Sequence, residues 1–384
     1  MPFYHSLGSI PHKRHTQFRK TDGSLYREEL MGTRGFSGIQ SILYHHWNPT
    51  SIKQAKILSK QPVELAENEN LEPRHIRTVD FKTTGDPITS REWLLVNSQT
   101  KLGLATPTES MKYFYKNGAA DELLFVHYGS GKLYSQFGNL EFRPGDYIVI
   151  PVGTTYQLEC APGTRFLVLE SEGSIEVPRR YRNEYGQFLE HAPFCERDIR
   201  IPTELTPHAE TGEFEVRVRI GDTLNQLIQL PHPFDVVGWD GYLYPWIFNI
   251  NDFEPIVGRI HQPPPVHQTF YSSGFVVCSF CPRLYDFHPQ AIPVPYNHSN
   301  VNSDEVLYYV DGEFMSRKGI DVGSFTHHPA GIPHGPHPGS VEQSLGKQST
   351  AELAVMVDTY APLHFTKKGL ELCDRSYVTS WLDK

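Results

Sequence analysis

Apolar and polar residues alternate with a period of two along much of the chain, which predicts β-strands rather than helices. Residues 213–220 (EFEVRVRI) alternate without interruption, and residues 121–159 hold four strand-like runs separated by Gly and Pro. Such runs, broken by turn residues at short intervals, are typical of an antiparallel meander or barrel. Residues 367–384 suggest a surface helix or arm. We therefore expect an all-β protein with a few peripheral helices.

One unit of this pattern occurs twice. Residues 121–129 (DELLFVHYG) match residues 304–312 (DEVLYYVDG), and each copy begins with Asp-Glu and has a Gly seven residues after the Glu. Downstream, both copies continue with Gly, Pro and Gly at the same spacing, after which the first copy has Tyr156 where the second has His334. Two copies of one unit predict two barrels of similar fold.

The repeated pattern resembles the cupin superfamily, whose second motif is Gly, five residues, Pro-x-Gly, two residues and His. The resemblance implies a bicupin, built from two antiparallel β-barrel or jelly-roll units. It also implies that the first unit holds no metal, because no His precedes Glu122 and Tyr156 replaces the His of the second motif. We expect a metal-less barrel within residues 1–175, a linker with strands over 176–232, and a metal-binding barrel with a tail over 233–384.

The second copy carries His298, Glu305 and His334 in the order and rough spacing of a two-His-one-carboxylate metal site. Such a facial triad leaves open positions on one side of a metal and is the usual cradle for non-heme Fe(II) that activates oxygen. Asp304 competes with Glu305 as the carboxylate. Neighbours on a strand face opposite ways, so only one of them can point into the barrel. Glu305 is the one that keeps the cupin spacing to Gly312.

A longer ordered set of segments, from Pro233 to Leu363, resembles homogentisate 1,2-dioxygenases. The segments are PFDVVGWDGYLYPWIFNINDF, a following loop His, PYNHSN, SDEVLYY, PHGPHP and ELAVMVDTYAPL. Before Pro233 the chain looks like the shorter bacterial branch of that family. The resemblance implies an Fe(II)-dependent ring-cleaving dioxygenase that converts homogentisate and O2 to maleylacetoacetate in tyrosine and phenylalanine catabolism. It also implies a homo-oligomer, a trimer or a hexamer.

The resemblance further implies roles for single residues. The iron ligands fall on the triad named above, the catalytic acid/base His falls on His261, and substrate contacts fall on His328, His334 and Phe314. Of the neighbours His327 and His328, one can face the barrel cavity. The family has a Tyr at the position of Phe314, and Phe cannot donate a hydrogen bond. A dioxygenase for another hydroquinone-type aromatic acid therefore stays open.

Composition restricts the partners. The net charge of −9 argues against nucleic acid or an anionic membrane, and no run approaches the roughly 20 apolar residues of a membrane span. The first residues lack the apolar core of a signal peptide, so we expect a cytoplasmic protein. The CxxC of Cys278 and Cys281 has no second pair to complete a zinc site, and we expect ordinary strand residues there. A non-oxygenase bicupin, either a metal-dependent isomerase or a ligand-binding module, is the alternative from a different class.

Overall fold

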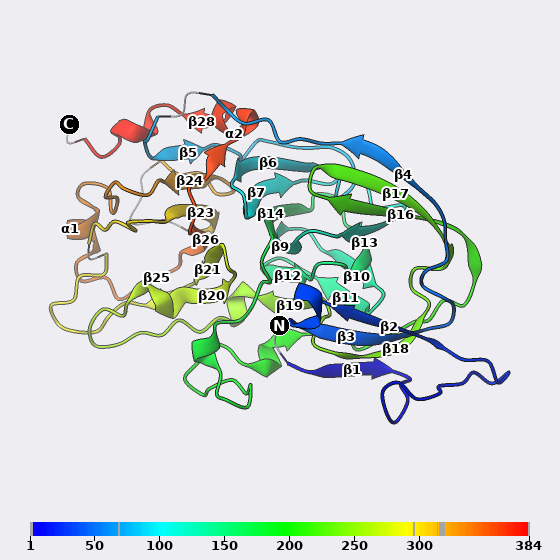
Figure 1. Ribbon diagram of the computed structural model, residues 1–384. Helices are drawn as coiled ribbons and strands as arrows, with labels where there is room; N and C mark the ends of the chain where they lie inside the picture. Colours follow the sequence, from blue (N-terminus) through cyan, green and yellow to red (C-terminus); the bar gives the residue numbers. More distant parts are fainter. Residues whose placement is uncertain (1–2, 68–69, 295, 313, 315–318, 383–384) are drawn as a thin grey trace.

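The computed structural model describes residues 3–67, 70–294, 296–312, 314 and 319–382. Three large sheets, antiparallel in almost every pairing, lie side by side in Figure 1, and a smaller four-stranded sheet lies below them. The α-helices of the described residues are two short ones, α1 (Ser340–Ser344) and α2 (Lys367–Glu371). The prediction of an all-β fold with a few peripheral helices is confirmed.

The strands of each sheet come from distant parts of the chain. The middle sheet has the order β15 (Ile199–Arg200), β19 (Trp246–Asn249), β12 (Asp146–Ile150), β9 (Asp121–Tyr128), β14 (Arg165–Ser171), β7 (Thr100–Ala105), β6 (Arg91–Val96) and β27 (His364–Phe365). The outer sheet has the order β11 (Gly138–Phe142), β10 (Gly131–Ser135), β13 (Thr155–Cys160), β8 (Phe114–Asn117), β16 (Thr211–Ile220), β17 (Thr223–Pro231) and β4 (Ile52–Lys60). The C-terminal sheet has the order β20 (Gln268–Tyr271), β21 (Phe275–Phe280), β26 (Leu353–Thr359), β23 (Asp304–Asp311), β24 (Phe325–His328), β5 (Arg74–Ile76) and β28 (Cys373–Asp374). The small sheets are β1 (His5–Gly8), β18 (Val236–Gly241), β3 (Gln40–His45) and β2 (Arg27–Gly32), and the pair β22 (Arg283–Leu284) and β25 (Ser349–Thr350).

The middle sheet is buried on both faces. On β9, Leu123 and Phe125 join a core shared with the C-terminal sheet, whereas Leu124 and Val126 join the core of the outer sheet. Successive strand residues point to opposite faces, so one apolar run supplies two cores. This is why β9 reads as a continuous apolar run instead of an alternating one. Each fully buried side chain of this size stabilises the fold by about 1.5–3 kcal/mol.

Strands from both sides of the expected boundaries at residues 175 and 232 share sheets. β5, from the first hundred residues, lies between β24 and β28 in the C-terminal sheet. Conversely, two strands that follow residue 232 pair with strands of the first 175 residues: β19 pairs with β12, and β18 pairs with β3. The hairpin of β16 and β17, within the segment expected to be a linker, completes the outer sheet between β8 and β4. The two barrels are therefore interlocked by exchanged strands.

Polar contacts from the middle sheet hold β23, the strand that carries Glu305. His127 Nδ1 lies 2.6 Å from the Tyr308 hydroxyl, which also accepts a hydrogen bond from Arg165 Nε at 3.1 Å. The Arg165 guanidinium also donates to the carbonyl of Gly323 at 2.8 Å. All three side chains are buried. The strand that carries Glu305 thus rests on buried side chains that belong to the other half of the chain.

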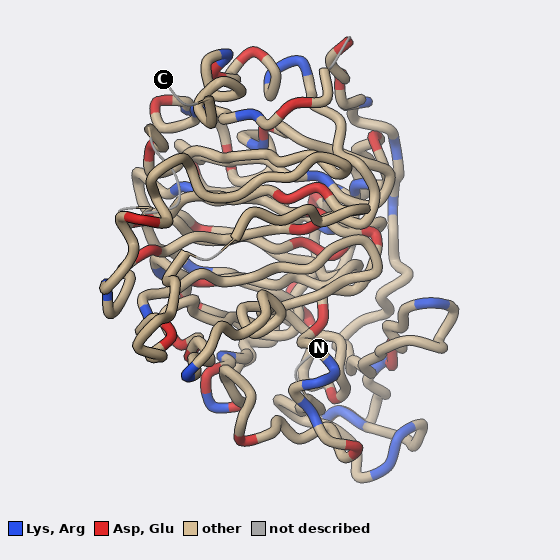
Figure 2. The backbone as a smooth tube through the Cα atoms, turned by 90° about the vertical axis from the view of Figure 1, so that its left-hand side faces the viewer, with Lys and Arg blue, Asp and Glu red and all other residues tan. Residues whose placement is uncertain are grey.

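Charges of both signs are interspersed along the face seen in Figure 2. Acidic residues outnumber basic ones, 44 to 35, so the mixture on this face accompanies a net negative molecule. In the part of the chain that the structure describes, no helix has the length and apolar character needed to cross a lipid bilayer.

Candidate metal centre and cavity

The structure brings His298, Glu305 and His334 together at one end of the C-terminal sheet. β23 supplies Glu305, while the backbones of His298 and His334 pair with each other through two hydrogen bonds of 2.8 Å. Nε2 of each imidazole lies 3.4 Å from the same oxygen, Glu305 Oε2. One ligand atom from each residue lies within 4.8 Å of the other two, and the rings cross at 64°. Because a lone pair lies in the plane of its ring, crossed rings can direct theirs at one point.

The residues present fit a divalent metal. Neither ring nitrogen of the buried His334 has a hydrogen-bond partner among the described residues. Glu305, which is buried, also lies directly across from the half-buried Asp358 on β26, so two carboxylates are neighbours. Burial, together with the charge of Glu305, raises the pKa of Asp358 to about 8. A cation would relieve this repulsion, and imidazole with carboxylate oxygen is a donor set suited to iron, zinc or manganese.

His328 supports Glu305 from behind. Its Nδ1 lies 2.9 Å from Glu305 Oε1, its Nε2 lies 3.3 Å from the Tyr377 hydroxyl, and its ring stacks on His334 at 4.6 Å. Burial alone would raise the pKa of Glu305, but the nearby imidazoles of His298, His328 and His334 hold it well below its usual value. His328 is fully buried and does not line the cavity. The structure therefore places it behind the ligand, although the resemblance implied contact with the substrate.

Asp304 and His327, which precede Glu305 and His328 in the chain, point to the opposite face of the sheet. His327 Nε2 lies 3.1 Å from Asp304 Oδ2, and the same carboxylate accepts backbone hydrogen bonds from Ala330 and Leu363. Because β23 and β24 are paired strands, the two rows of side chains alternate between opposite faces of the sheet. Asp304 thus fixes loops outside the barrel while Glu305 faces the interior.

A cavity of about 540 Å³ opens on two members of the triad, His298 and Glu305. Its floor consists of three rows of side chains across β23, β26 and β21. The rows are Glu305, Asp358 and Val276; Leu307, Met356 and Cys278; and Tyr309, Ala354 and Phe280. Glu305 and Asp358 thus occupy one end of the floor, the middle row is free of charge, and Glu352 also lines the cavity. Phe314 lies over the third row, with its ring 4.5 Å from that of Tyr309.

His261 lines the same cavity from the loop that precedes β20. Its Nε2 lies 3.0 Å from the Tyr296 hydroxyl and its Nδ1 lies 3.3 Å from Asp286 Oδ2. The Tyr296 ring in turn meets the ring of the ligand His298 at 5.9 Å. The side chain of His261 is 42% exposed, so both a substrate and solvent can reach it. The expected acid/base His and the expected metal ligands therefore share one cavity.

The sequence pattern did not identify Tyr296, Asp286 and Arg283 as residues of this site. A signal existed for Tyr296, because it precedes His298 by two residues and a period of two places both on one side of an extended segment. Arg283 follows the apolar run of β21 by three residues, where a charged residue is ordinary for the end of a strand. Its position on the cavity wall becomes visible only in three dimensions.

In the first copy an arginine side chain supplies the positive charge beside the glutamate. Arg91, which is fully buried, forms ion pairs with Glu122, the counterpart of Glu305, and with Glu170 on the next strand at 3.2 Å. Tyr156, the counterpart of His334, donates to Glu122 Oε2 at 2.5 Å and accepts from Arg91 at 3.1 Å. These contacts satisfy both carboxylates with the chain's own side chains.

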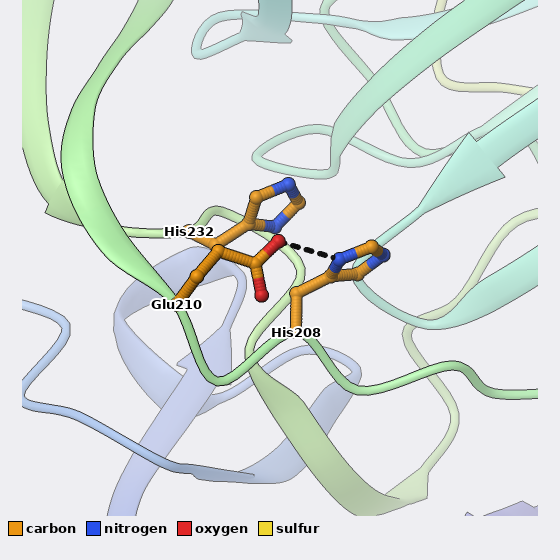
Figure 3. A group of neighbouring side chains, drawn as sticks. All are labelled: His208, Glu210 and His232. Atoms are coloured by element: carbon orange, nitrogen blue, oxygen red, sulfur yellow. Dashed lines mark hydrogen bonds and ion pairs between the residues drawn. The ribbon is translucent and has the colours of Figure 1, made fainter.

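A second group of the same residue types lies near the open end of the β16–β17 hairpin: His208, Glu210 and His232 (Figure 3). Here the two imidazoles stack at 4.1 Å with only 18° between their planes. Stacked rings point their lone pairs side by side instead of at one point. Moreover, His232 Nδ1 already accepts the N–H of Phe234 at 3.0 Å. The ligand atoms of this group lie as close together as those of the triad, within 4.8 Å, but its ring orientation and this hydrogen bond make it the poorer metal site.

Comparisons with known proteins agree with the site. Residues 10–250 match a family model described as "Homogentisate 1,2-dioxygenase N-terminal". A protein of Saccharolobus solfataricus with the name "Putative dioxygenase" is 42% identical over 99% of both chains. Homogentisate 1,2-dioxygenase of Bradyrhizobium diazoefficiens is 24% identical over 93% of this chain and 76% of its own. A cupin 2 conserved barrel domain protein from Leptotrichia buccalis aligns with 77% of this chain and 99% of its own, at 10% identity and a TM-score of 0.36.

Proposed function

We propose, on the premise that the chain belongs to the homogentisate 1,2-dioxygenase family, that it uses Fe(II) and O2 to cleave the ring of a dihydroxylated aromatic acid. Homogentisate is the first candidate substrate, with maleylacetoacetate as the product. The observation that carries the proposal is the convergence of His298, Glu305 and His334 at the end of a mostly apolar cavity that His261 also lines. The proposal includes a cytoplasmic homo-oligomer, which light scattering of the purified protein tests.

The chain's own residues prepare this chemistry. His298, Glu305 and His334 would hold the metal, which supplies a common binding point for the substrate and O2 and the redox chemistry of ring opening. His328 keeps the Glu305 carboxylate in one orientation, as partners behind metal ligands generally do. The apolar part of the floor at the metal end, which begins with Val276, accepts the face of an aromatic ring and excludes water from it.

His261 is placed to move a proton. Its Nε2, which now lies beside the Tyr296 hydroxyl, can accept the proton of a substrate phenol in the same position. Asp286 at Nδ1 orients the imidazole and stabilises the positive charge that the ring acquires. Tyr296 stands between His261 and the ligand His298, so a phenol that displaces its hydroxyl would lie next to the metal centre.

Oxygen uptake with homogentisate, followed together with the absorbance of the ring-opened product, tests the function. The iron-loaded wild type should consume one O2 per substrate. His334→Ala should lose both the metal and the activity, whereas His261→Ala should keep the metal and lose about 10²–10⁴-fold in turnover. His364→Ala, an exposed His on β27, is the matched control and should behave as the wild type. Full activity in His334→Ala with stoichiometric iron would exclude the triad.

Phe314 favours one further candidate within the same reaction class. Its side chain lines the cavity where the resemblance implies a Tyr, so the cavity offers no hydroxyl at that position. A hydroquinone-type acid other than homogentisate would fit this change. A panel of dihydroxylated aromatic acids in the same oxygen-uptake assay separates the two, and no uptake with any of them would favour a non-oxygenase bicupin.

A further inference from the structure

The far end of the cavity, opposite the metal centre, holds a cationic side chain that forms no ion pair with a described residue. Arg283 lines the cavity from β22, and its guanidinium lies 5.9 Å from the rings of both Phe280 and Tyr285. Its one hydrogen bond to a described residue goes to the carbonyl of Cys281 at 3.4 Å. No carboxylate of a described residue lies within 4.0 Å of it. A guanidinium offers five donors in a planar fork that matches a carboxylate.

A second polar group at this end also lacks a partner. His267 lines the cavity, its side chain is buried, and its Nδ1 has no hydrogen-bond partner among the described residues. Burial, with the nearby charges of Arg283 and His261, lowers the pKa of His267 to about 3, so the ring is neutral. A neutral imidazole can donate one N–H. Two unused donors therefore border one pocket wall.

The pairing of β21, β26 and β23 gives the distance between these donors and the metal centre. Phe280, which the guanidinium approaches, is in the third row, and Glu305 is in the first. Four residues of extended strand separate the rows, which is about 13 Å. An acid group attached to the ring by one carbon is too short to reach Arg283 while the ring hydroxyls are at the metal.

We infer that Arg283, helped by His267, binds an anionic group that the substrate carries on a spacer longer than the one-carbon side chain of homogentisate. This rests on the proposed function, since it assigns the ring to the metal end of the cavity. The substrate class is then a hydroxylated aromatic acid whose carboxylate is separated from the ring by two or more carbons. The uncharged middle row, Leu307, Met356 and Cys278, accommodates such a spacer.

Ligand binding to the metal-free protein tests this without turnover. The probes are 3-hydroxyphenylacetate, 3-(3-hydroxyphenyl)propanoate and 4-(3-hydroxyphenyl)butanoate, each with its uncharged primary amide, measured by calorimetry. In the wild type the two longer acids should bind more tightly than their amides by about tenfold or more, as a charge-assisted hydrogen-bonded pair provides. Arg283→Met should abolish this difference and leave the amides unchanged, while Arg283→Lys should keep part of it. Arg259→Met removes an exposed arginine of the same half and should change nothing.

An acid-to-amide ratio that is the same in the wild type and in Arg283→Met overturns the inference, as does a ratio that is largest for the acetate. Circular dichroism of each variant shows that a lost preference does not come from unfolding. Oxygen uptake by the iron-loaded wild type with the dihydroxylated forms of the three acids is measured separately. No uptake with any acid would refute the dioxygenase function but leave the Arg283-dependent binding intact, so the two failures are distinguishable.

Discussion

Substitution of His328 by Ala tests whether support from behind Glu305 matters to the metal centre. The change removes the 2.9 Å hydrogen bond to Glu305 Oε1 and leaves the direct ligands in place. A hydrogen bond to a charged group contributes about 1.5–3 kcal/mol, and loss of a partner behind a metal ligand typically lowers metal affinity by about 10- to 100-fold. We expect the dissociation constant for Zn²⁺ or for Fe(II) without oxygen to rise by that factor. His328 is fully buried, so solvent cannot replace the lost donor.

The assay is a competition titration of the metal-free protein against a chromophoric chelator. His328→Asn keeps an N–H donor near the position of Nδ1 and should recover most of the affinity. His327→Ala is the matched control, because this adjacent and equally buried His contacts Asp304 on the opposite face of the sheet. It should lower the stability of the fold and leave the metal affinity unchanged. Equal losses of affinity in His327→Ala and His328→Ala would refute the assignment of the two faces.

Three further predictions concern charge and metal. Arg91→Met leaves Glu122 buried without its cation, which should cost about 3–5 kcal/mol and lower Tm by about 5 °C, a loss that shrinks as the pH falls and Glu122 becomes protonated. Burial alone would lower the pKa of His45, but hydrogen bonds to Asp235 and a second carboxylate raise it to about 9. Its contribution, about 3 kcal/mol, is therefore complete below about pH 6.5 and lost as the pH rises through about 9, so urea unfolding should show a decline there that His45→Gln lacks. Chelation of the metal should lower the Tm of the wild type but not that of His334→Ala.

Local pattern was sufficient to predict the strand that carries the metal ligand. The alternation of Asp304 and Glu305, with the spacing to Gly312, indicates which carboxylate faces inwards, and the structure has that arrangement. The same reasoning could say only that one of His327 and His328 faces the cavity. In fact His328 faces inwards but ends behind Glu305, since the wall of the cavity is formed by strands and loops other than β24.

The pairing of strands that lie far apart in the chain could not be predicted from the sequence. Nothing in residues 74–76 indicates that β5 joins the C-terminal sheet between β24 and β28, because a three-residue strand carries little pattern and its partners lie some hundreds of residues away. The same holds for Arg283, whose neighbours in the chain are ordinary strand residues. Its place at the end of the cavity depends on the register of β21 against β26, which no single segment specifies.

The two halves show why one of them needs a cation from solution. In each copy the conserved position of the repeat is a glutamate with an acidic neighbour directly across the next strand: Glu122 with Glu170, and Glu305 with Asp358. Two carboxylates at this distance repel each other unless a positive charge lies between them. The first half supplies that charge with the Arg91 guanidinium, which fills the site permanently and leaves no open position. The second half has imidazoles, which carry no charge when neutral, in place of the arginine, so under the proposed function a metal would supply the charge and leave positions for a substrate and O2. In the first copy of the repeat, side chains of the protein therefore fill the site, whereas in the second copy the corresponding glutamate faces a cavity.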